Sequence, residues 1–189
     1  MSRAPRLPID SPRLSLRRFR GDDLARFVAY RNDPDVSRFQ SWQRMSSQDA
    51  RRILREQRAR VPGTPGRWLQ VALELKASGE LIGDCGLRVM AREPWQAEIG
   101  FTLAREHQGQ GLATEAVGRL MRFAFEALAL RRVVAITVCE NARSAALMER
   151  LGMRREAHFV ENSWFKGAWV SEYHYALLAD EWRRRADAS

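Results

Sequence analysis

The stretch FTLAREHQGQGLATEAVGRLMRFAFEAL, residues 101–128, decides how this chain folds. Its first residues continue an alternation of apolar and polar side chains that starts at Ala97, and this period predicts a strand that ends near Leu103. From Leu112 onward the apolar side chains recur at intervals of three and four residues, which predicts a helix. We therefore expect a strand, a turn containing Gly109 and Gly111, and a helix, in that order.

The glycine turn has the features of an anion site. A helix N-terminus presents unpaired backbone N–H groups and a partial positive charge, and both stabilise an anion. Glycines let the backbone approach a phosphate closely because they carry no Cβ atom. Residues 108–113 are therefore a candidate pyrophosphate site. Two glycines before a helix are equally compatible with a tight corner that binds nothing.

Two better-known phosphate sites do not fit this turn. A dinucleotide-binding fold requires a third glycine, where this chain has Thr114, and an acidic residue about twenty positions later, where residues 133–135 are apolar. The phosphate loop of nucleotide triphosphatases ends in Gly-Lys-Ser/Thr, which is absent here. Both interpretations are rejected.

Patterns elsewhere predict strands and helices in mixed order within one domain. The predicted strands cover residues 13–19, 69–75, 81–90, 93–103, 133–138, 154–161 and 169–178. The predicted helices follow Gly21 and cover 47–61, 112–128 and 141–151, while residues 36–45 form a loop or a short helix. Because residues 133–138 form a continuous apolar run, we expect that strand to be buried on both faces. The domain is expected to span residues 10–182, with short tails at 1–9 and 183–189.

Composition limits the class of protein. The chain has 189 residues, 45% of them hydrophobic and 29% charged, as expected of one soluble globular domain. No run approaches the roughly 18 apolar residues of a membrane-spanning helix, and the N-terminus lacks the apolar core of a signal peptide. Cys85 and Cys139 lie in predicted strands and suggest neither a disulfide framework nor a metal site. A cytoplasmic location is expected.

The net charge of +9 permits several partners without choosing among them. Phosphate contacts dominate nucleic-acid binding, so a basic protein can have such a partner. However, Lys76 and Lys166 are the only lysines, and most arginines are scattered along the chain. We interpret the charge mainly as a bias toward arginine. It suits an anionic ligand, and contact with nucleic acid is compatible with it but not required.

Residues 108–113 also match a specific pattern, Arg/Gln-x-x-Gly-x-Gly/Ala, at every defined position. The segment resembles motif A of the GNAT superfamily of acyl-CoA-dependent N-acyltransferases. Asn141-x-x-Ser144 and the following residues 149–153 resemble the next block of that superfamily. Residues 97–101, 155–157 and 177–182, with a first helix ending at residues 32–34, resemble the ribosomal-protein N-terminal acetyltransferase branch, the RimJ/RimL type. The resemblance covers roughly residues 10–182.

The resemblance implies a fold and a donor. The fold is α/β (mixed α+β), the GNAT acyltransferase fold, with a central, mostly antiparallel, splayed sheet of about seven strands flanked by about four helices. The donor is acetyl-CoA, and no metal is expected. The residues implied to contact coenzyme A are Phe101, Thr102, Leu103, Gln108, Gly109, Gln110, Gly111, Leu112, Ala113, Thr114, Asn141 and Ser144.

Glu98 and Ser144 are the candidate catalytic residues. The resemblance places a carboxylate at Glu98, where it would act as a base through water. The same strand face carries the small Gly100, which is expected to leave room for a ligand. The alternative is an ordinary surface glutamate. Ser144 lies on the apolar stripe of its predicted helix, where it faces inward or bonds the carbonyl four residues earlier. The resemblance suggests that it faces coenzyme A and can donate to the thiolate. Many members have a tyrosine that acts as the acid in this helix, but Met148 stands at that position here, so that role is absent or moved.

The acceptor is the least determined part of the prediction. An α-amine with a pKa of about 7.7–8.0 demands little of a base, whereas a lysine amine near 10.4 is almost wholly charged at neutral pH. A protein N-terminal α-amine is the leading hypothesis. The alternatives are a small-molecule amine, such as an antibiotic, polyamine or amino acid, and a basic RNA- or ribosome-associated binding module without catalysis. A monomer or a homodimer fits either enzyme. Candidate acceptor contacts are Phe39, Trp42, Glu161 and Trp164.

Overall fold

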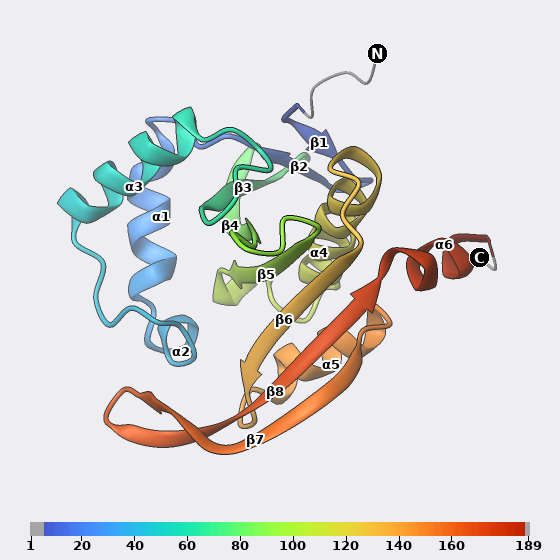
Figure 1. The fold of residues 1–189 in the computed structure, drawn as a ribbon. Coiled ribbons are helices and arrows are strands. Elements are labelled where there is room, and N and C mark those ends of the chain that lie inside the picture. Colours follow the sequence, from blue (N-terminus) through green and yellow to red (C-terminus); the bar gives the residue numbers. More distant parts are fainter. Residues whose placement is uncertain (1–5, 188–189) are drawn as a thin grey trace.

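The structure, a computed structural model that describes residues 6–187, is built on one eight-stranded sheet (Figure 1). The order across the sheet is β1-β2-β3-β4-β5-β6-β8-β7, and every neighbouring pair is antiparallel except the parallel pair β5 and β6. The strands are β1 (Ile9–Asp10), β2 (Leu14–Arg17), β3 (Trp68–Leu75), β4 (Glu80–Val89), β5 (Gln96–Leu103), β6 (Arg132–Val138), β7 (Arg154–Phe165) and β8 (Ala168–Leu178).

Helices cover both faces of the first half of the sheet. On one face lie α1 (Asp23–Asn32), the short α2 (Pro34–Ser37) and α3 (Ser47–Ala59), and on the other lies α4 (Leu112–Arg122). Successive strand residues point to opposite faces. Accordingly, Ala72 packs in the cluster of Phe27 and Tyr30, whereas Val71 and Leu73 pack in the cluster that includes Leu120 and Met121.

The sheet opens between β5 and β6. The two strands are paired only over three positions, from Gln96 with Arg132 to Glu98 with Val134. Beyond that point β6 pairs with β8 alone, and Ile136 is 40% exposed. The expectation that residues 133–138 would be buried on both faces is therefore wrong, because the face of β6 that carries Val134, Ile136 and Val138 is only partly covered.

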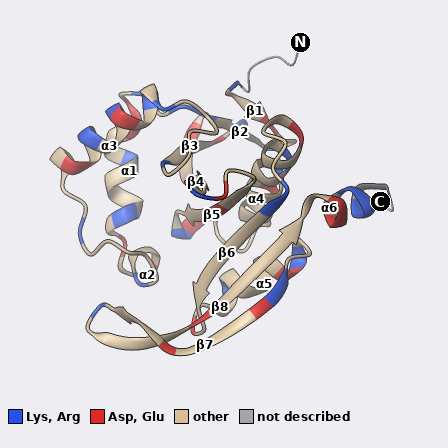
Figure 2. Cartoon of the chain, viewed as in Figure 1, with Lys and Arg blue, Asp and Glu red and all other residues tan. Residues whose placement is uncertain are grey.

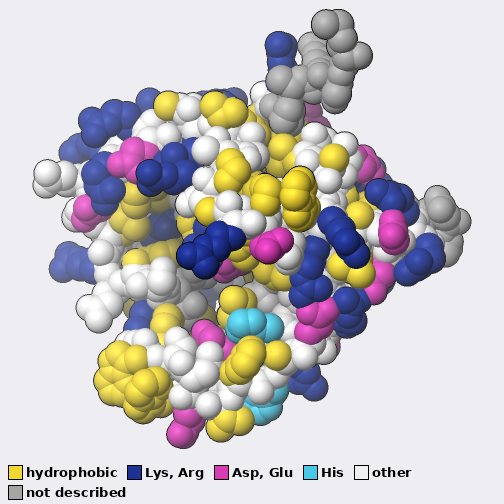
Figure 3. All heavy atoms as spheres, viewed as in Figure 1, with side chains coloured by type: hydrophobic (Ala, Val, Ile, Leu, Met, Phe, Trp, Pro, Cys, Tyr) yellow, Lys and Arg dark blue, Asp and Glu magenta, His cyan; other side chains and the backbone are white. Residues whose placement is uncertain are grey.

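The C-terminal half is a long hairpin with one helix packed against it. Strands β7 and β8 form the hairpin, and α5 (Ala142–Arg150) lies behind it in the view of Figure 1. Hydrophobic side chains gather at the hairpin tip (Figure 3), where Trp164 and Trp169 are 62% and 60% exposed and lie ring to ring. Close to this tip, Lys166 Nζ donates to the carbonyl of Ser37 at 2.6 Å, joining the hairpin to α2.

The predicted fold class is confirmed, with differences at element ends. The helix from Leu112 continues past Arg122 as one π-helical turn, Phe123–Ala127. Residues expected to form the C-terminal tail belong to α6 (Ala179–Asp187), because the Glu181 carboxylate accepts from the backbone N–H of Leu178 and Trp182 packs on Phe125. In the predicted N-terminal tail, Ile9 is already in β1. Residues 1–5 and 188–189 lie outside the described part of the chain.

In the part of the chain that the structure describes, the basic residues do not form one continuous stripe in the view of Figure 2. Lysines and arginines alternate with acidic residues on α3, β7 and α6 (Figure 2). Across residues 6–187, no helix is both long enough and apolar enough to cross a membrane.

Candidate active site

The glycine turn has the geometry expected of an anion site. Gly109 and Gly111 have φ angles of +75° and +76°, a region that L side chains rarely adopt, so glycine is needed at both positions. The helix bonding of α4 starts with the N–H of Glu115, which donates to the carbonyl of Gly111. Among the described residues, the backbone N–H groups of 109–114 have no hydrogen-bond partner, and they are therefore available to an anion.

A cleft of about 940 Å³ runs from this turn to α2. It contains eleven of the twelve residues implied to contact coenzyme A. Gln110 is the exception, because its side chain turns back to bond the carbonyl of Glu106 at 3.0 Å. The lining residues are Asp35, Val36, Phe39, Gln40, Phe101, Thr102, Leu103, Arg105, Gln108, Gly109, Gly111, Leu112, Ala113, Thr114, Asn141, Ala142, Arg143, Ser144, Ala146, Leu147 and Arg150.

The edge of β5 faces this cleft. The bonds from Ala104 N to the Ile82 carbonyl and from Met90 N to the Gln96 carbonyl show that the even-numbered residues of β5 bond to β4. The backbone groups of Phe101 and Leu103 therefore point to the opposite edge, where β6 has moved away. The sheet opens here, as the splayed sheet implied by the resemblance predicts, and β5 pairs with β4 in unbroken register from Ala97 to Leu103.

Side-chain amides already occupy two of these edge carbonyls. Gln108 Nε2 donates to the carbonyl of Leu103 at 2.9 Å, and Gln40 Nε2 lies 3.4 Å from the carbonyl of Phe101. Gln40 was not predicted, since a single glutamine in an aromatic-rich loop carries no recognisable signal. The N–H groups of the edge remain for a ligand.

The start of α5 provides a second wall of the cleft. The Asn141 side chain caps the helix by accepting from the backbone N–H of Ser144 at 3.2 Å. Ser144 is 8% exposed, and its hydroxyl makes no hydrogen bond with any residue in the described range, including the carbonyl four positions earlier. The hydroxyl thus remains available to a ligand in the cleft. Asn141 lines the cleft as well, although its side-chain oxygen is engaged in the cap.

No tyrosine of residues 6–187 lines the cleft. Met148 is 2% exposed and packs in the core. Tyr175 is bonded to the Glu149 carboxylate at 2.9 Å, and burial, together with that bond, raises its pKa to about 12. A tyrosine acid at this end of the site is therefore not available.

Glu98 lies at the point where β5 leaves β6 rather than in the wall of the cleft. Its carboxylate is paired with the guanidinium of Arg88 on β4. The space expected beside Gly100 is covered by Trp68, since a Cβ atom on Gly100 would lie 3.8 Å from the indole ring. That expectation of open room for a ligand is corrected.

The four predicted acceptor contacts are not brought together. Phe39 lines the cleft. Trp42 packs away from it, with its ring 4.1 Å from the guanidinium of the buried Arg31. Glu161 and Trp164 are exposed on the β7–β8 hairpin and do not line the cleft.

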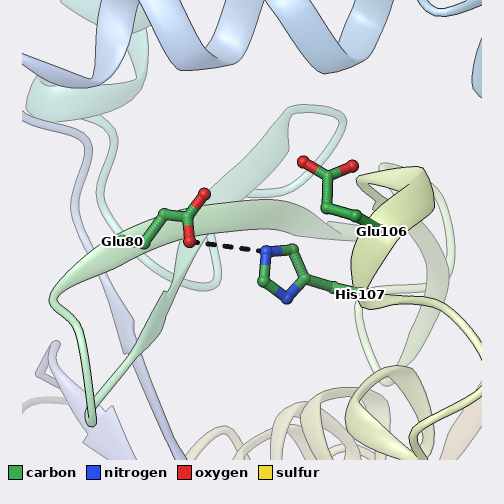
Figure 4. Close-up of side chains that lie close together, drawn as sticks. All are labelled: Glu80, Glu106 and His107. Carbon is green, nitrogen blue, oxygen red and sulfur yellow. Dashed lines mark ion pairs between the residues drawn. The ribbon is translucent and has the colours of Figure 1, made fainter.

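Three side chains of metal-ligand type gather next to the glycine turn. Glu80, Glu106 and His107 place their ligand atoms within 4.8 Å of one another (Figure 4). Arg26 extends a guanidinium nitrogen to both carboxylates, 2.8 Å from that of Glu80. Because Arg26 already supplies a cation there, ion pairing accounts for the cluster. The expectation of an enzyme without a metal stays a prediction.

An anion site beside an open strand edge is what a transferase of acyl groups from coenzyme A requires. The chain belongs to the acetyltransferase (GNAT) domain family, which matches residues 13–154. Acetyl-CoA is accordingly the co-substrate and an amine the acceptor. Because this is a family of acetyltransferases, the chain is an enzyme, and the alternative of a non-catalytic binding module is rejected.

Relatives and solved structures agree with the family. An uncharacterised N-acetyltransferase, p20 of Bacillus licheniformis, is 30% identical over 90% of this chain and 95% of its own. The [ribosomal protein uS5]-alanine N-acetyltransferase of Escherichia coli is 27% identical over 54% of each chain. A GNAT-family acetyltransferase from Bacillus anthracis superposes with a TM-score of 0.81 and 26% identity, covering 93% of this chain and all of the other. Spermidine N-acetyltransferase from Vibrio cholerae, solved with CoA and spermine, shares the fold at a TM-score of 0.79 and 21% identity, covering 92% and 99%.

Proposed function

We propose that this enzyme acetylates the N-terminal α-amine of a protein. The acetyl-CoA pyrophosphate binds at the N-terminus of α4, and the thioester lies at the open edge of β5. The amine attacks the thioester carbon directly, Glu98 takes the amine proton through water, and Ser144 donates a proton to the departing thiolate and regains one from solvent. The thiol has a pKa near 8.5, so solvent is an alternative donor if Ser144 does not serve.

The observation that carries this proposal is the unpartnered hydroxyl of Ser144 in the same cleft as the unpaired N–H groups of 109–114. Because no protein group in the described range engages this hydroxyl, it can donate a hydrogen bond to a ligand in the cleft, which supports the proposed role. The backbone N–H groups at Phe101 and Leu103 are fixed donors beside the gap and suit a developing oxyanion.

Charge favours an α-amine over a polyamine. The net charge of +9 repels a polycation. The candidate base, Glu98, also has the cationic Arg88 beside it, which would oppose the approach of a second positive charge. An α-amine is about a tenth neutral at pH 7 and presents one ionisable group. Similarity does not distinguish the two acceptors, since the chain resembles both the uS5-alanine acetyltransferase and the spermidine acetyltransferase, so charge carries this choice.

The test is a panel assay for thiol release from acetyl-CoA. Peptides with a free N-terminus are compared with the same peptides blocked at the N-terminus, with polyamines and with aminoglycosides. Turnover with free peptides alone is expected. Turnover only with polyamines or aminoglycosides would replace the proposed acceptor. The cytoplasmic location and the oligomeric state stay predictions.

A further inference from the structure

A row of four residues crosses the sheet where β5 and β6 part. Trp68 of β3 is in register with Arg88 of β4, Arg88 with Glu98 of β5, and Glu98 with Val134 of β6. Side chains of directly paired residues lie on the same face and interact. The row therefore ends at the last paired position before the gap in which the thioester is proposed to lie.

Arg88 holds Glu98 through one oxygen only. Nη2 of Arg88 contacts Oε2 of Glu98, whose side chain is 16% exposed. Within residues 6–187, Oε1 of Glu98 makes no hydrogen bond. The contact thus restricts the rotamers of a side chain with three rotatable bonds and leaves one carboxylate oxygen free to accept a proton.

Arg88 is itself supported from the opposite side. Its guanidinium carbon lies 5.1 Å from the centroid of the Trp68 ring, which is the geometry of a cation–π contact. The indole can lie across the sheet because position 86 is glycine: a Cβ atom on Gly86 would be 2.9 Å from Cε3 of Trp68. Contacts therefore run from Gly86 through Trp68 and Arg88 to Glu98.

We infer that Arg88 is a positioning residue that aims the Glu98 carboxylate at the acceptor amine. The inference rests on the proposed function, because it requires Glu98 to take the amine proton. As the N–C bond forms, the C–S bond breaks and its electron pair goes to sulfur. One amine proton passes through water to Oε1 of Glu98, and the thiolate takes a proton from solvent, either directly or through Ser144, whose hydroxyl then regains a proton from solvent. Displacement of the base by about 1 Å is enough to cost a large factor in rate.

The experiment compares Arg88→Met, Arg88→Lys, Glu98→Gln and the double variant Arg88→Met/Glu98→Gln. Arg92→Met, at an exposed arginine in the β4–β5 turn, is the matched control. Circular dichroism verifies the fold of each. With a peptide bearing a free N-terminus, Arg88→Met is expected to lower kcat about tenfold while the KM for acetyl-CoA is unchanged. Arg88→Lys should recover part of the loss, and Arg92→Met should match the wild type.

The double variant separates positioning from any independent effect. In the Glu98→Gln background, Arg88→Met should have almost no further effect on kcat. An equal loss in both backgrounds, an unchanged kcat or a faster Arg88→Met enzyme would overturn the inference. Normal turnover by Glu98→Gln would instead refute the proposed base.

If none of the amines tested is acetylated, kinetics cannot test the role of Arg88, and a structural measurement is needed. That outcome would refute the proposed function, and crystal structures of the wild type and Arg88→Met would then test the hold on Glu98 by themselves. A displaced Glu98 carboxylate in the variant is expected. An identical carboxylate position in both would overturn the inference.

Discussion

Arg143 donates a hydrogen bond from Nη1 to Oε1 of Gln108 at 3.1 Å and thereby ties α5 to the glycine turn. Because Gln108 also donates to the carbonyl of Leu103, one side chain joins three elements of the site: β5, the turn and α5. The two walls of the cleft are thus held in a fixed relation before the coenzyme binds, which lowers the ordering cost of binding.

Removal of this connection should weaken coenzyme binding. We expect Gln108→Ala to raise the Kd of acetyl-CoA about fivefold to tenfold, about 1–1.4 kcal/mol, because the turn loses both of the hydrogen bonds that the Gln108 side chain makes. Titration calorimetry measures the Kd. Gln48→Ala, at an exposed glutamine of α3, serves as the control. Equal affinity in the Gln108 variant would show that the turn needs no support from this residue.

Gly109→Asp tests the anion site itself. A carboxylate at this turn should repel the pyrophosphate and raise the Kd at least tenfold, about 1.4 kcal/mol. Gly79→Asp is matched, since Gly79 also has a positive φ, +72° against +75°, and an added Cβ atom meets nothing within 4 Å at either glycine. Both variants carry the same backbone strain, so only Gly109→Asp should bind acetyl-CoA more weakly. A similar Kd for the two would remove the phosphate assignment.

Ser144→Ala tests the proton donor. The variant keeps the Asn141 cap, which uses the backbone N–H of Ser144, so coenzyme affinity should change little. We expect kcat to fall by about tenfold to a hundredfold if the hydroxyl protonates the thiolate. Steady-state kinetics decide this, with Ser47→Ala on α3 as the control. A kcat equal to that of the wild type would assign the proton to solvent.

A buried ionic cluster beneath α1 should dominate the stability of this layer. Arg31 and Asp84 are each 3% exposed, their side chains are 2.8 Å apart, and Tyr30 donates to the same carboxylate at 2.6 Å. Burial raises the pKa of Tyr30 well above its usual value, so it remains a donor. Asp84→Ala leaves the Arg31 charge uncompensated and should cost about 3–5 kcal/mol in urea unfolding. A loss below about 1 kcal/mol would mean that water reaches Arg31.

Glu156 predicts a specific pH dependence of stability. Hydrogen bonds from Arg132 and Arg154 lower its pKa from 4.5 to about 2. Since the folded pKa is depressed, its stabilising effect is complete above the unfolded pKa and is lost as pH falls toward 2. The difference in unfolding free energy between wild type and Glu156→Gln should therefore be constant above pH about 5.5 and shrink below it. Glu126→Gln, at a 63% exposed side chain, is the control. A difference that does not change with pH would contradict the assignment.

Local patterns predicted most of the elements. The alternation around Ala97 and the helical spacing after Leu112 placed the strand, turn and helix correctly. These features depend on neighbouring residues only. The exposure of Ile136 was missed because it depends on where β6 leaves β5, which no local period encodes.

The site was predicted less completely than the fold. Residues of the turn were found because they share one short motif. Gln40, Arg143 and Arg88 were missed, since each acts through a partner that only the fold brings beside it. The partners are Phe101, Gln108 and Glu98, respectively. Trp42 and Trp164 were assigned to the acceptor because they are aromatic and lie in the two segments, 34–45 and 161–167, where the resemblance places acceptor contacts. The structure instead stacks Trp42 on Arg31.

The acceptor assignment has one direct test. A peptide with a free α-amine and an internal lysine is incubated with the enzyme and acetyl-CoA, and the modified position is located by fragmentation mass spectrometry. The acetyl group is expected on the α-amine, with none on the lysine and none on spermidine added as a competitor. Acetylation of the lysine or of spermidine, with the α-amine left free, would contradict the account.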